Sequence, residues 1–137
     1  MRIMGLDVGE KRIGIALSDQ MGWTAQAHSV LIRNNLEEDL QSIIKICQEN
    51  EVTVIVVGLP KNMNGTIGPK AIEVQEFGGI LHAKAALPVI YQDERLSTVS
   101  AQKLLIAADV SRQKRKKVVD KIAASTILQT YLDSRKS

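Results

Sequence analysis

RIMGLDVGEKRIGIALS, residues 2–18, consists of two apolar runs separated by the short polar segment GEK. Segments of this kind, joined by so few residues, predict two antiparallel strands, at residues 2–8 and 12–18, closed by a hairpin. Asp7 lies at the end of the first run. Because a buried charge is costly unless it is paired or bound to a cation, this carboxylate is either a paired structural group or a functional group.

The hydrophobic pattern beyond the hairpin alternates between strand and helix. Asn34 or Asn35 can cap the first helix, whose apolar residues recur at helical spacing, and the continuous run VTVIVVG is typical of a strand covered on both faces. The pattern predicts, in order, a strand over 23–32, a helix over 36–47, a strand over 52–58, a helix over 70–85, a strand over 88–91, a helix from Ser97 or Thr98 to Ala108, and a last helix over 117–133.

This order of elements predicts an α/β fold with a mixed five-stranded sheet and helices on both faces, which is the ribonuclease H-like arrangement. Right-handed crossovers would place the helix-connected strands beside the first strand. The chain has 137 residues, close to the usual size of one domain, so we expect a single domain over residues 1–137.

Composition favours a soluble intracellular protein. Hydrophobic residues make up 45% and charged residues 24% of the chain, and no apolar run approaches the ~18 residues of a membrane span. The N-terminus lacks the pattern of a signal peptide, so we expect a cytoplasmic location. The single cysteine, Cys47, lies on an apolar helical stripe and is expected to pack in the core.

Three acids from separate parts of the chain are candidates for a shared site. Asp7 lies at the end of the first predicted strand and Glu94 just past the end of the last one. Groups at the carboxyl ends of parallel strands meet in one crevice, so we expect the two acids to face the same crevice from neighbouring strands. Asp120 lies on the last helix, and the small residues at 123–125 would let that helix approach the sheet closely.

Carboxylates without a nearby His or Cys cluster suit Mg²⁺ or Mn²⁺. Two such ions can activate a water and stabilise the leaving oxygen of a phosphodiester. Each acid also has a structural alternative. Asp7 could accept backbone N–H groups of the hairpin, Glu94 could pair with Arg95, and Asp120 could pair with Lys116 or Lys117.

Basic residues are concentrated in the second half of the chain. Residues 1–68 carry 6 basic and 8 acidic side chains, whereas residues 69–137 carry 12 and 7. The run SRQKRKK at 111–117 is either a phosphate-contacting patch or a solvated helix start. Candidate contacts to nucleic acid are Lys11 and Arg12 after the first strand, Lys61, Asn62 and Asn64 in the loop after the central strand, Arg95, and Arg112, Lys114, Arg115, Lys116 and Lys117. As an alternative for Asn64, Asn-Gly is a common turn dipeptide.

Four segments, MGLDVGEKRIGIALSD, VVGLPKNMNGTIGPKA, DERLSTVSA and KIAASTILQTYL, resemble successive motifs of the YqgF family of pre-16S ribosomal RNA nucleases and Holliday junction resolvases in the ribonuclease H-like superfamily. The resemblance covers nearly the whole chain. It implies that Asp7, Glu94 and Asp120 are the catalytic metal-binding acids and that the GLPKNMNG loop lines the site. Gly58 stands where ribonuclease H proper has an acid, and the resemblance implies that Glu94 substitutes for it.

The resemblance makes a metal-dependent nuclease acting on structured nucleic acid the leading hypothesis, with processing of the pre-16S rRNA 5′ end ahead of junction resolution. Two alternatives remain. GLDVG also resembles the first phosphate loop of the actin and sugar-kinase superfamily, whose members close two such domains around ATP. A non-catalytic RNA-binding module would use the basic run without a metal. A resolvase that cuts two strands symmetrically is expected to act as a homodimer.

Overall fold

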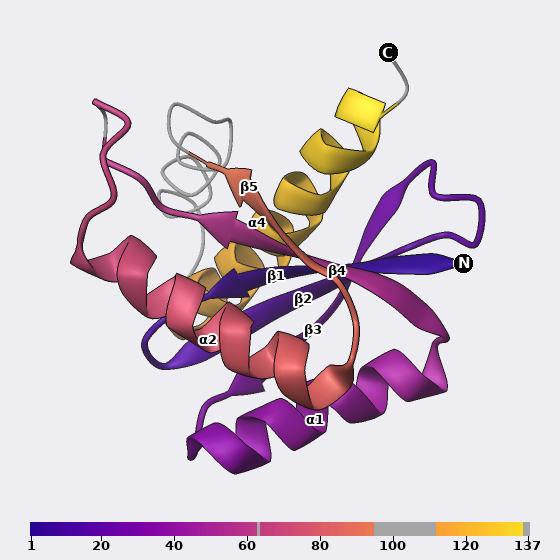
Figure 1. Cartoon of the computed structure of the whole chain (residues 1–137), viewed down its shortest axis with the longest axis horizontal. Coiled ribbons are helices and arrows are strands. Elements are labelled where there is room, and N and C mark those ends of the chain that lie inside the picture. The colour runs from indigo at the N-terminus through magenta and orange to yellow at the C-terminus, as the bar shows by residue number, and fades with distance from the viewer. Residues whose placement is uncertain (63, 95–111, 136–137) are drawn as a thin grey trace.

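The computed structural model describes residues 1–62, 64–94 and 112–135, and residues 112–120 by their backbone alone. The expected helix between Ser97 or Thr98 and Ala108 lies outside the described residues. The elements, in order, are β1 (Arg2–Val8), β2 (Arg12–Ser18), β3 (Ala25–Ile32), α1 (Leu36–Glu49), β4 (Val52–Leu59), α2 (Pro69–Ala85), β5 (Val89–Asp93) and α4 (Arg112–Arg135) (Figure 1).

The five strands form one mixed sheet in the order β3-β2-β1-β4-β5. β1 pairs with β2, and β2 with β3, in antiparallel fashion. β4 is parallel to both β1 and β5, so it lies in the interior of the sheet. The mixed five-stranded sheet predicted from the sequence is confirmed, and the helix-connected strands lie on the β1 side as right-handed crossovers require.

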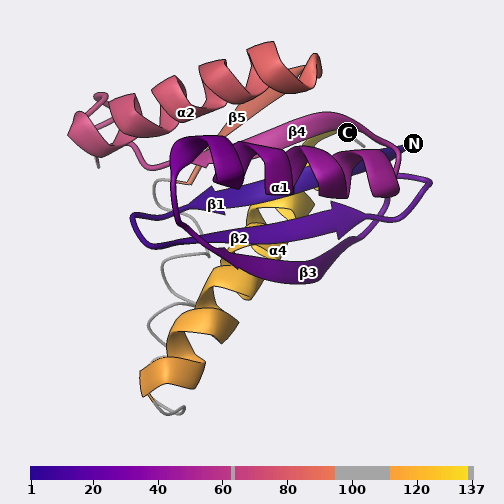
Figure 2. The same ribbon diagram turned by 90° about the horizontal axis from the view of Figure 1, so that it is seen from below.

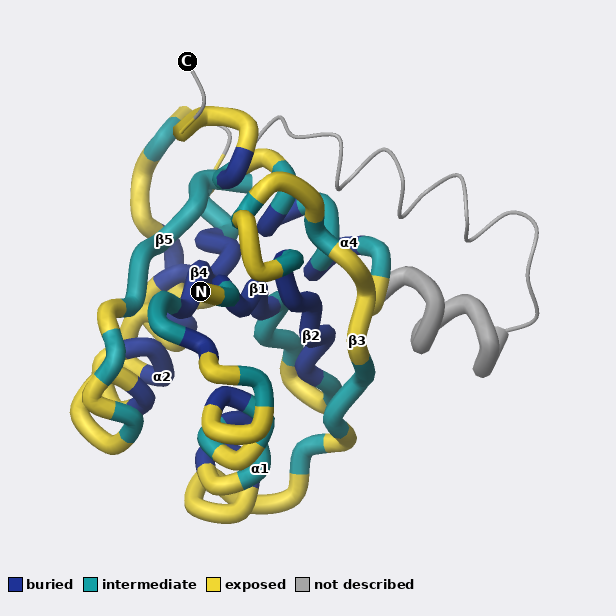
Figure 3. The backbone as a smooth tube through the Cα atoms, turned by 90° about the vertical axis from the view of Figure 1, so that its right-hand side faces the viewer, coloured by how far each residue is buried: buried dark blue, intermediate teal, exposed yellow. Residues whose placement is uncertain are grey.

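Helices cover both faces of the sheet. α1 and α2 lie on one face and α4 lies across the other (Figures 1 and 2). Two clusters of buried side chains correspond to these layers, one packed under α1 and α2 and one under α4. The burial pattern in Figure 3 follows the same division, with buried backbone along β1, β2 and β4 and exposed outer faces on the helices.

Some boundaries differ from those that the sequence predicted. α4 begins at Arg112 rather than near Lys117, because its first turns carry Arg, Lys and Gln, which favour helix but give no apolar period. β5 ends at Asp93 rather than at Tyr91. The first helix agrees: Asn35 is the N-cap of α1, and its side chain accepts a hydrogen bond of 2.9 Å from the Glu38 backbone N–H.

Cys47 is a core residue, as expected. It is 3% exposed, and its Sγ lies 3.8 Å from the Met4 Sδ beneath β1. Burial raises the pKa of the Cys47 thiol to about 11, so the thiolate is scarce at neutral pH. This cysteine therefore contributes packing rather than reactivity.

No helix in the part of the chain that the structure describes has the length and apolar character needed to cross a membrane.

α4 approaches β1 closely because position 5 has no side chain. A Cβ built on Gly5 would lie 2.7 Å from the Leu128 Cβ and 3.0 Å from the Ala124 carbonyl oxygen. Ala124 and Leu128 are themselves fully buried. Both nearby atoms belong to the helix backbone or lie next to it, so a side chain at position 5 would displace the helix rather than a flexible side chain.

We therefore expect Gly5→Ala to destabilise the protein by overpacking, by roughly 1–3 kcal/mol, or about 3–10 °C in melting temperature. Gly79→Ala is the matched control, since a Cβ on Gly79 in α2 meets nothing within 4 Å. Replacing this exposed helical glycine should stabilise by about 0.5–1 kcal/mol. Thermal melting followed by circular dichroism measures both, and equal effects of the two variants would contradict the close packing of α4.

Candidate active site

Two of the three candidate acids lie at the carboxyl edge of the sheet. Asp7 is the second-last residue of β1, opposite Gly14 of β2, and Glu94 directly follows β5. The expectation that they come from neighbouring strands is wrong, because β4 lies between β1 and β5. Each strand pairs with β4 instead of with the other, so the carboxylates must meet across the end of β4.

Gly58 of β4 makes that meeting possible. A Cβ on Gly58 would lie 2.7 Å from the Glu94 Oε2 and 2.5 Å from the Ile127 Cδ1 of α4. The Glu94 Oε2 is buried, and the Glu94 backbone N–H donates to the Leu59 carbonyl at 3.3 Å. The absent side chain thus leaves a space on β4 that the carboxylate of Glu94 enters from the next strand.

Asp7 shares this face of the sheet. Side chains two residues apart in a strand point the same way, and the Cβ direction of Gly5 faces α4, so Asp7 also faces the α4 side. The pairing of β1 with β4 matches Leu6 with Val57, which brings Asp7 beside Gly58 in the next position. Asp7 and the Glu94 carboxylate therefore flank Gly58 on one face, one from each side.

Asp120 belongs to α4, but its side chain lies outside the described residues. Ala123 and Ala124 are buried against the sheet, and residues three and four apart share one face of a helix. Tyr131 and Arg135 lie near Met1 and Ile3, so the earlier turns of α4 extend towards the other end of β1, where Asp7 lies. Position 120 thus comes one turn before the buried alanines, in the part of α4 that extends towards that end of β1. A shared site of three acids remains a prediction.

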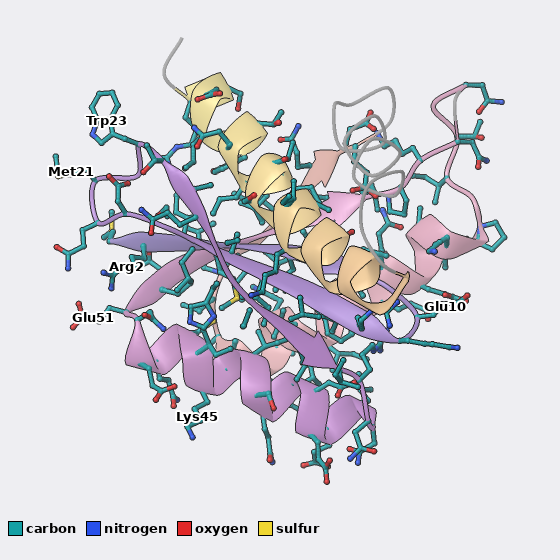
Figure 4. The ribbon with its side chains drawn as sticks, turned by 180° about the vertical axis from the view of Figure 1, so that it is seen from behind. Arg2, Glu10, Met21, Trp23, Lys45 and Glu51 are labelled. Carbon is teal, nitrogen blue, oxygen red and sulfur yellow. The ribbon has the colours of Figure 1, made fainter. Side chains whose placement is uncertain are left out.

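Three of the candidate basic contacts, Lys11, Arg12 and Lys61, lie at the same end of the sheet as Asp7 and Glu94. Lys11 and Arg12 lie at the β1–β2 turn, whose Glu10 is labelled in Figure 4 at the opposite end of the sheet from Trp23. Lys61 follows β4 by two residues, and its Nζ lies 3.9 Å from the Asp93 Oδ2. The side chains of Arg95, Arg112, Lys114, Arg115, Lys116 and Lys117 lie outside the described residues.

The two loop asparagines have structural roles within the β4–α2 loop. Asn62 donates through Nδ2 to the Thr66 hydroxyl at 3.0 Å, and the Asn64 Oδ1 accepts from the Thr66 backbone N–H and hydroxyl at 3.1 and 2.7 Å. Gly65 has φ of +87°, as a turn requires. These bonds support the turn interpretation of Asn64-Gly65. Contact of either asparagine with nucleic acid stays a prediction.

The donor atoms fit a hard divalent cation. Asp7 and Glu94 offer carboxylate oxygens on one face, and oxygen ligands suit Mg²⁺ and Mn²⁺. Among residues whose side chains are described, no three His, Cys, Asp or Glu residues form a metal-binding group. A set of three ligands would therefore need a group outside them, such as Asp120.

Sequence reasoning missed Arg33, which lies just after β3 and contacts the β1–β2 hairpin on the other face of the sheet. Its Nη1 donates to the Gly9 carbonyl at 2.8 Å. An arginine at a strand end carries no motif or periodic signal. Only the fold brings Arg33 next to Gly9, which lies 24 residues earlier in the sequence.

Comparison with known proteins agrees with this geometry. The family model described as "RuvX: Holliday junction resolvase" matches residues 1–134. Relatives from Syntrophomonas wolfei and Heliobacterium modesticaldum, both described as "Putative pre-16S rRNA nuclease", are 60% and 56% identical, over 97% and 98% of this chain and 94% and 91% of theirs.

Solved structures show the same fold at low identity. RuvC of Thermus thermophilus, in complex with a Holliday junction substrate, superposes with a TM-score of 0.60 at 11% identity, covering 99% of this chain and 96% of that one. The fowlpox virus resolvase in complex with Holliday junction DNA gives 0.57 at 12% identity, over 100% of both chains. The fold is thus the ribonuclease H-like one predicted from the sequence, and the chain belongs to the RuvX (YqgF) family of Holliday junction resolvases.

Proposed function

We propose that this protein is a divalent-metal-dependent nuclease that hydrolyses phosphodiester bonds in structured nucleic acid, with the precursor of 16S rRNA as its substrate. The observation that carries the proposal is the space at Gly58, into which the half-buried Glu94 side chain brings its buried Oε2 beside Asp7. Carboxylates held close together repel each other unless a cation compensates their charge. Family membership supports this activity over that of the actin and sugar-kinase superfamily.

Asp7, Glu94 and Asp120 would hold Mg²⁺ or Mn²⁺. When bound, such ions supply a metal-activated water and charge stabilisation for the leaving oxygen. The Glu94 backbone N–H is bonded to the Leu59 carbonyl, which fixes at the edge of the sheet the backbone from which the carboxylate reaches the site. Lys61, whose Nζ lies 3.9 Å from the Asp93 Oδ2, carries its positive charge at the same end of the sheet as the acids and would contact a phosphate of the substrate from there.

The basic run at the start of α4 would bind flanking phosphates. Its five basic residues occur within seven positions, and phosphate contacts of this kind give affinity without sequence preference. We propose that the whole chain acts as one nuclease domain, located in the cytoplasm.

Holliday junction resolution is the second candidate function, favoured by the description of the matching family model. The curated relatives named for pre-16S rRNA, at 52–60% identity, support RNA processing more closely than structural neighbours at 11–12% identity support junction cleavage. A resolvase would be expected to act as a homodimer, because two symmetric strands must be cut. Cleavage of a pre-16S RNA fragment and of a four-way DNA junction, measured side by side with and without Mg²⁺, separates the two functions. Binding without cleavage of either would instead indicate a non-catalytic RNA-binding module.

Replacing Asp7 with Asn tests the acid site directly. We expect Asp7→Asn to lower Mg²⁺-dependent cleavage by orders of magnitude, because the substitution removes an anionic ligand and keeps the shape. Its melting temperature in metal-free buffer should be equal or higher, since repulsion between acids is relieved. Glu76→Gln, a change at an exposed acid on α2, is the control and should leave the rate unchanged. A wild-type rate for Asp7→Asn would rule out its catalytic assignment.

The space on β4 can be filled by a single methyl group. Gly58→Ala should displace the Glu94 carboxylate and the Ile127 side chain, because its Cβ would approach them to 2.7 and 2.5 Å. We expect cleavage to fall by at least about tenfold, since misplacing a catalytic group by about 1 Å can cost a hundredfold. Gly5→Ala, which perturbs α4 on the neighbouring strand, is the control for destabilisation. Comparable activity of Gly58→Ala and wild type would show that Glu94 does not need this space.

The basic run is tested by salt dependence. Changing Lys114, Arg115, Lys116 and Lys117 to Gln should weaken nucleic-acid binding and reduce the magnitude of the negative slope of log K against log salt by roughly 3–4, if all four residues contact phosphates of a duplex. Lys45→Gln, an exposed change on α1 at the opposite face, should leave the slope unchanged. Fluorescence anisotropy across a salt titration measures both, and an unchanged slope for the quadruple variant would identify the run as a solvated helix face.

A further inference from the structure

Arg33 joins the β1–β2 hairpin to the helices on the far face of the sheet. Its backbone N–H donates to the Lys11 carbonyl at 2.9 Å, and its Nη1 donates to the Gly9 carbonyl at 2.8 Å. Two carbonyls of one turn are thus bound by a single residue from the end of β3. Gly9 lies two residues after Asp7, so the fixed carbonyl is close to the acid in the chain.

The guanidinium is itself held from two directions. Its Nε donates to the Asp39 Oδ2 of α1 at 3.3 Å, and the guanidinium carbon lies 5.3 Å from the centre of the Phe77 ring in α2. Asp39 is 2% exposed, and its Oδ1 accepts from the Asn34 backbone N–H at 2.9 Å. A buried carboxylate and an aromatic face thus fix the direction in which Nη1 points.

Side chains of the described residues leave a space under the hairpin on this face. It is a cavity of about 230 Å³, with Gly9, Arg33, Lys70 and Phe77 among its lining residues. Within the turn, the Gly9 N–H donates to the Arg12 carbonyl at 2.9 Å, and a Cβ on Gly9 would lie 2.8 Å from that oxygen. The turn is closed by its own backbone and joined to α1 and α2 through Arg33.

We propose that Arg33 is a positioning residue for the acid site. It acts through the Gly9 carbonyl to hold the hairpin, and with it Asp7 and the basic residues Lys11 and Arg12, in the arrangement that the substrate requires. This inference rests on the proposed nuclease function. It assigns a role to a residue on the face of the sheet opposite to the acids, which neither substrate nor metal would touch.

The geometry requires arginine rather than any cation. Nε and Nη1 are rigid parts of one planar fork, which bonds Asp39 and Gly9 simultaneously while its face lies on Phe77. The single ammonium of a lysine would keep the charge beside Asp39 but could not hold both partners in the same way. Arg33→Lys therefore separates positioning from mere charge balance of the buried carboxylate.

The test compares Arg33→Lys with Arg2→Lys. Arg2 also donates from Nη1 to a backbone carbonyl, that of Asn50 at 3.4 Å, but at the opposite end of β1. We expect Arg33→Lys to speed exchange of the Gly9 amide hydrogen about tenfold or more under native conditions, and to lower kcat about 10- to 100-fold with a smaller change in KM. Arg2→Lys should change neither. Normal Gly9 exchange or a wild-type kcat for Arg33→Lys would overturn the proposal.

Two further measurements keep the outcome decisive. If Arg33→Lys does not fold, Asp39→Asn, which keeps the shape of the anchor and removes its charge, should give the same accelerated Gly9 exchange. If the wild-type protein cleaves neither RNA nor junction DNA, the proposed function fails, and Mn²⁺ titration then tests Arg33 separately. A dissociation constant raised about tenfold by Arg33→Lys supports positioning of the acids, whereas an unchanged constant, or no Mn²⁺ binding by the wild type, overturns it.

Discussion

The structure depends on the absence of side chains between α4 and the middle of the sheet. Gly5 on β1 and Gly58 on β4 both face α4, and a Cβ at either position would lie within 3 Å of a helix atom. Close-packed interiors transmit such conflicts instead of absorbing them. Gly5, where a Cβ would meet the Leu128 Cβ and the Ala124 carbonyl oxygen, thus sets how near α4 lies to β1, whereas Gly58 leaves room for the ends of the Ile127 and Glu94 side chains. The distance between α4 and β1 in turn decides whether a residue on α4 can share a site with residues at the strand ends.

The two faces of the sheet also differ in what they contribute. On the α4 face, Gly58 has no side chain, so β4 contributes the space that the Glu94 carboxylate enters and no charge of its own. On the other face, α1 and α2 supply the larger apolar core and the anchor for Arg33. The proposed acids and the Arg33 anchor thereby lie on opposite faces of one sheet, and Arg33 contacts the hairpin that follows Asp7.

Much of the fold was accessible from the sequence because local patterns encode it. The apolar runs of β1, β2 and β4 and the helical stripes of α1 and α2 give their positions directly, and Asn35 marks a helix start. Strand neighbours were less accessible. Asp7 and Glu94 were expected on adjacent strands, but the sheet places β4 between them, since pairing order depends on crossovers and not on any residue in the two strands.

The sequence singles out the candidate acids of the site, but not the residues that support them. Asp7 and Glu94 stand out because carboxylates beside apolar strands are rare unless they have a use. The importance of Gly58 is visible only when the atoms that surround it are known, and the same holds for Arg33, whose partner Gly9 is 24 residues away. A single residue whose role depends on a contact with a distant part of the chain belongs to no repeat or charge cluster, so no pattern in the sequence identifies it.

The basic residues of the chain lie close in sequence to the candidate acids. A cluster of acids repels a polyanion, so a nuclease built on carboxylates needs positive charge close by, and the net charge of +3 is too small to supply it as a uniform field. The chain instead places basic residues next to the acids in sequence: Lys11 and Arg12 follow Asp7, and the run at 112–117 precedes Asp120 on the same helix. In the proposed site, Lys11 and Arg12 would thereby bring positive charge to the carboxyl edge of the sheet beside Asp7, and the run at 112–117 would do the same for Asp120. Because exposed charges more than a Debye length apart, about 8 Å at physiological salt, are largely screened, this proximity matters more than the total.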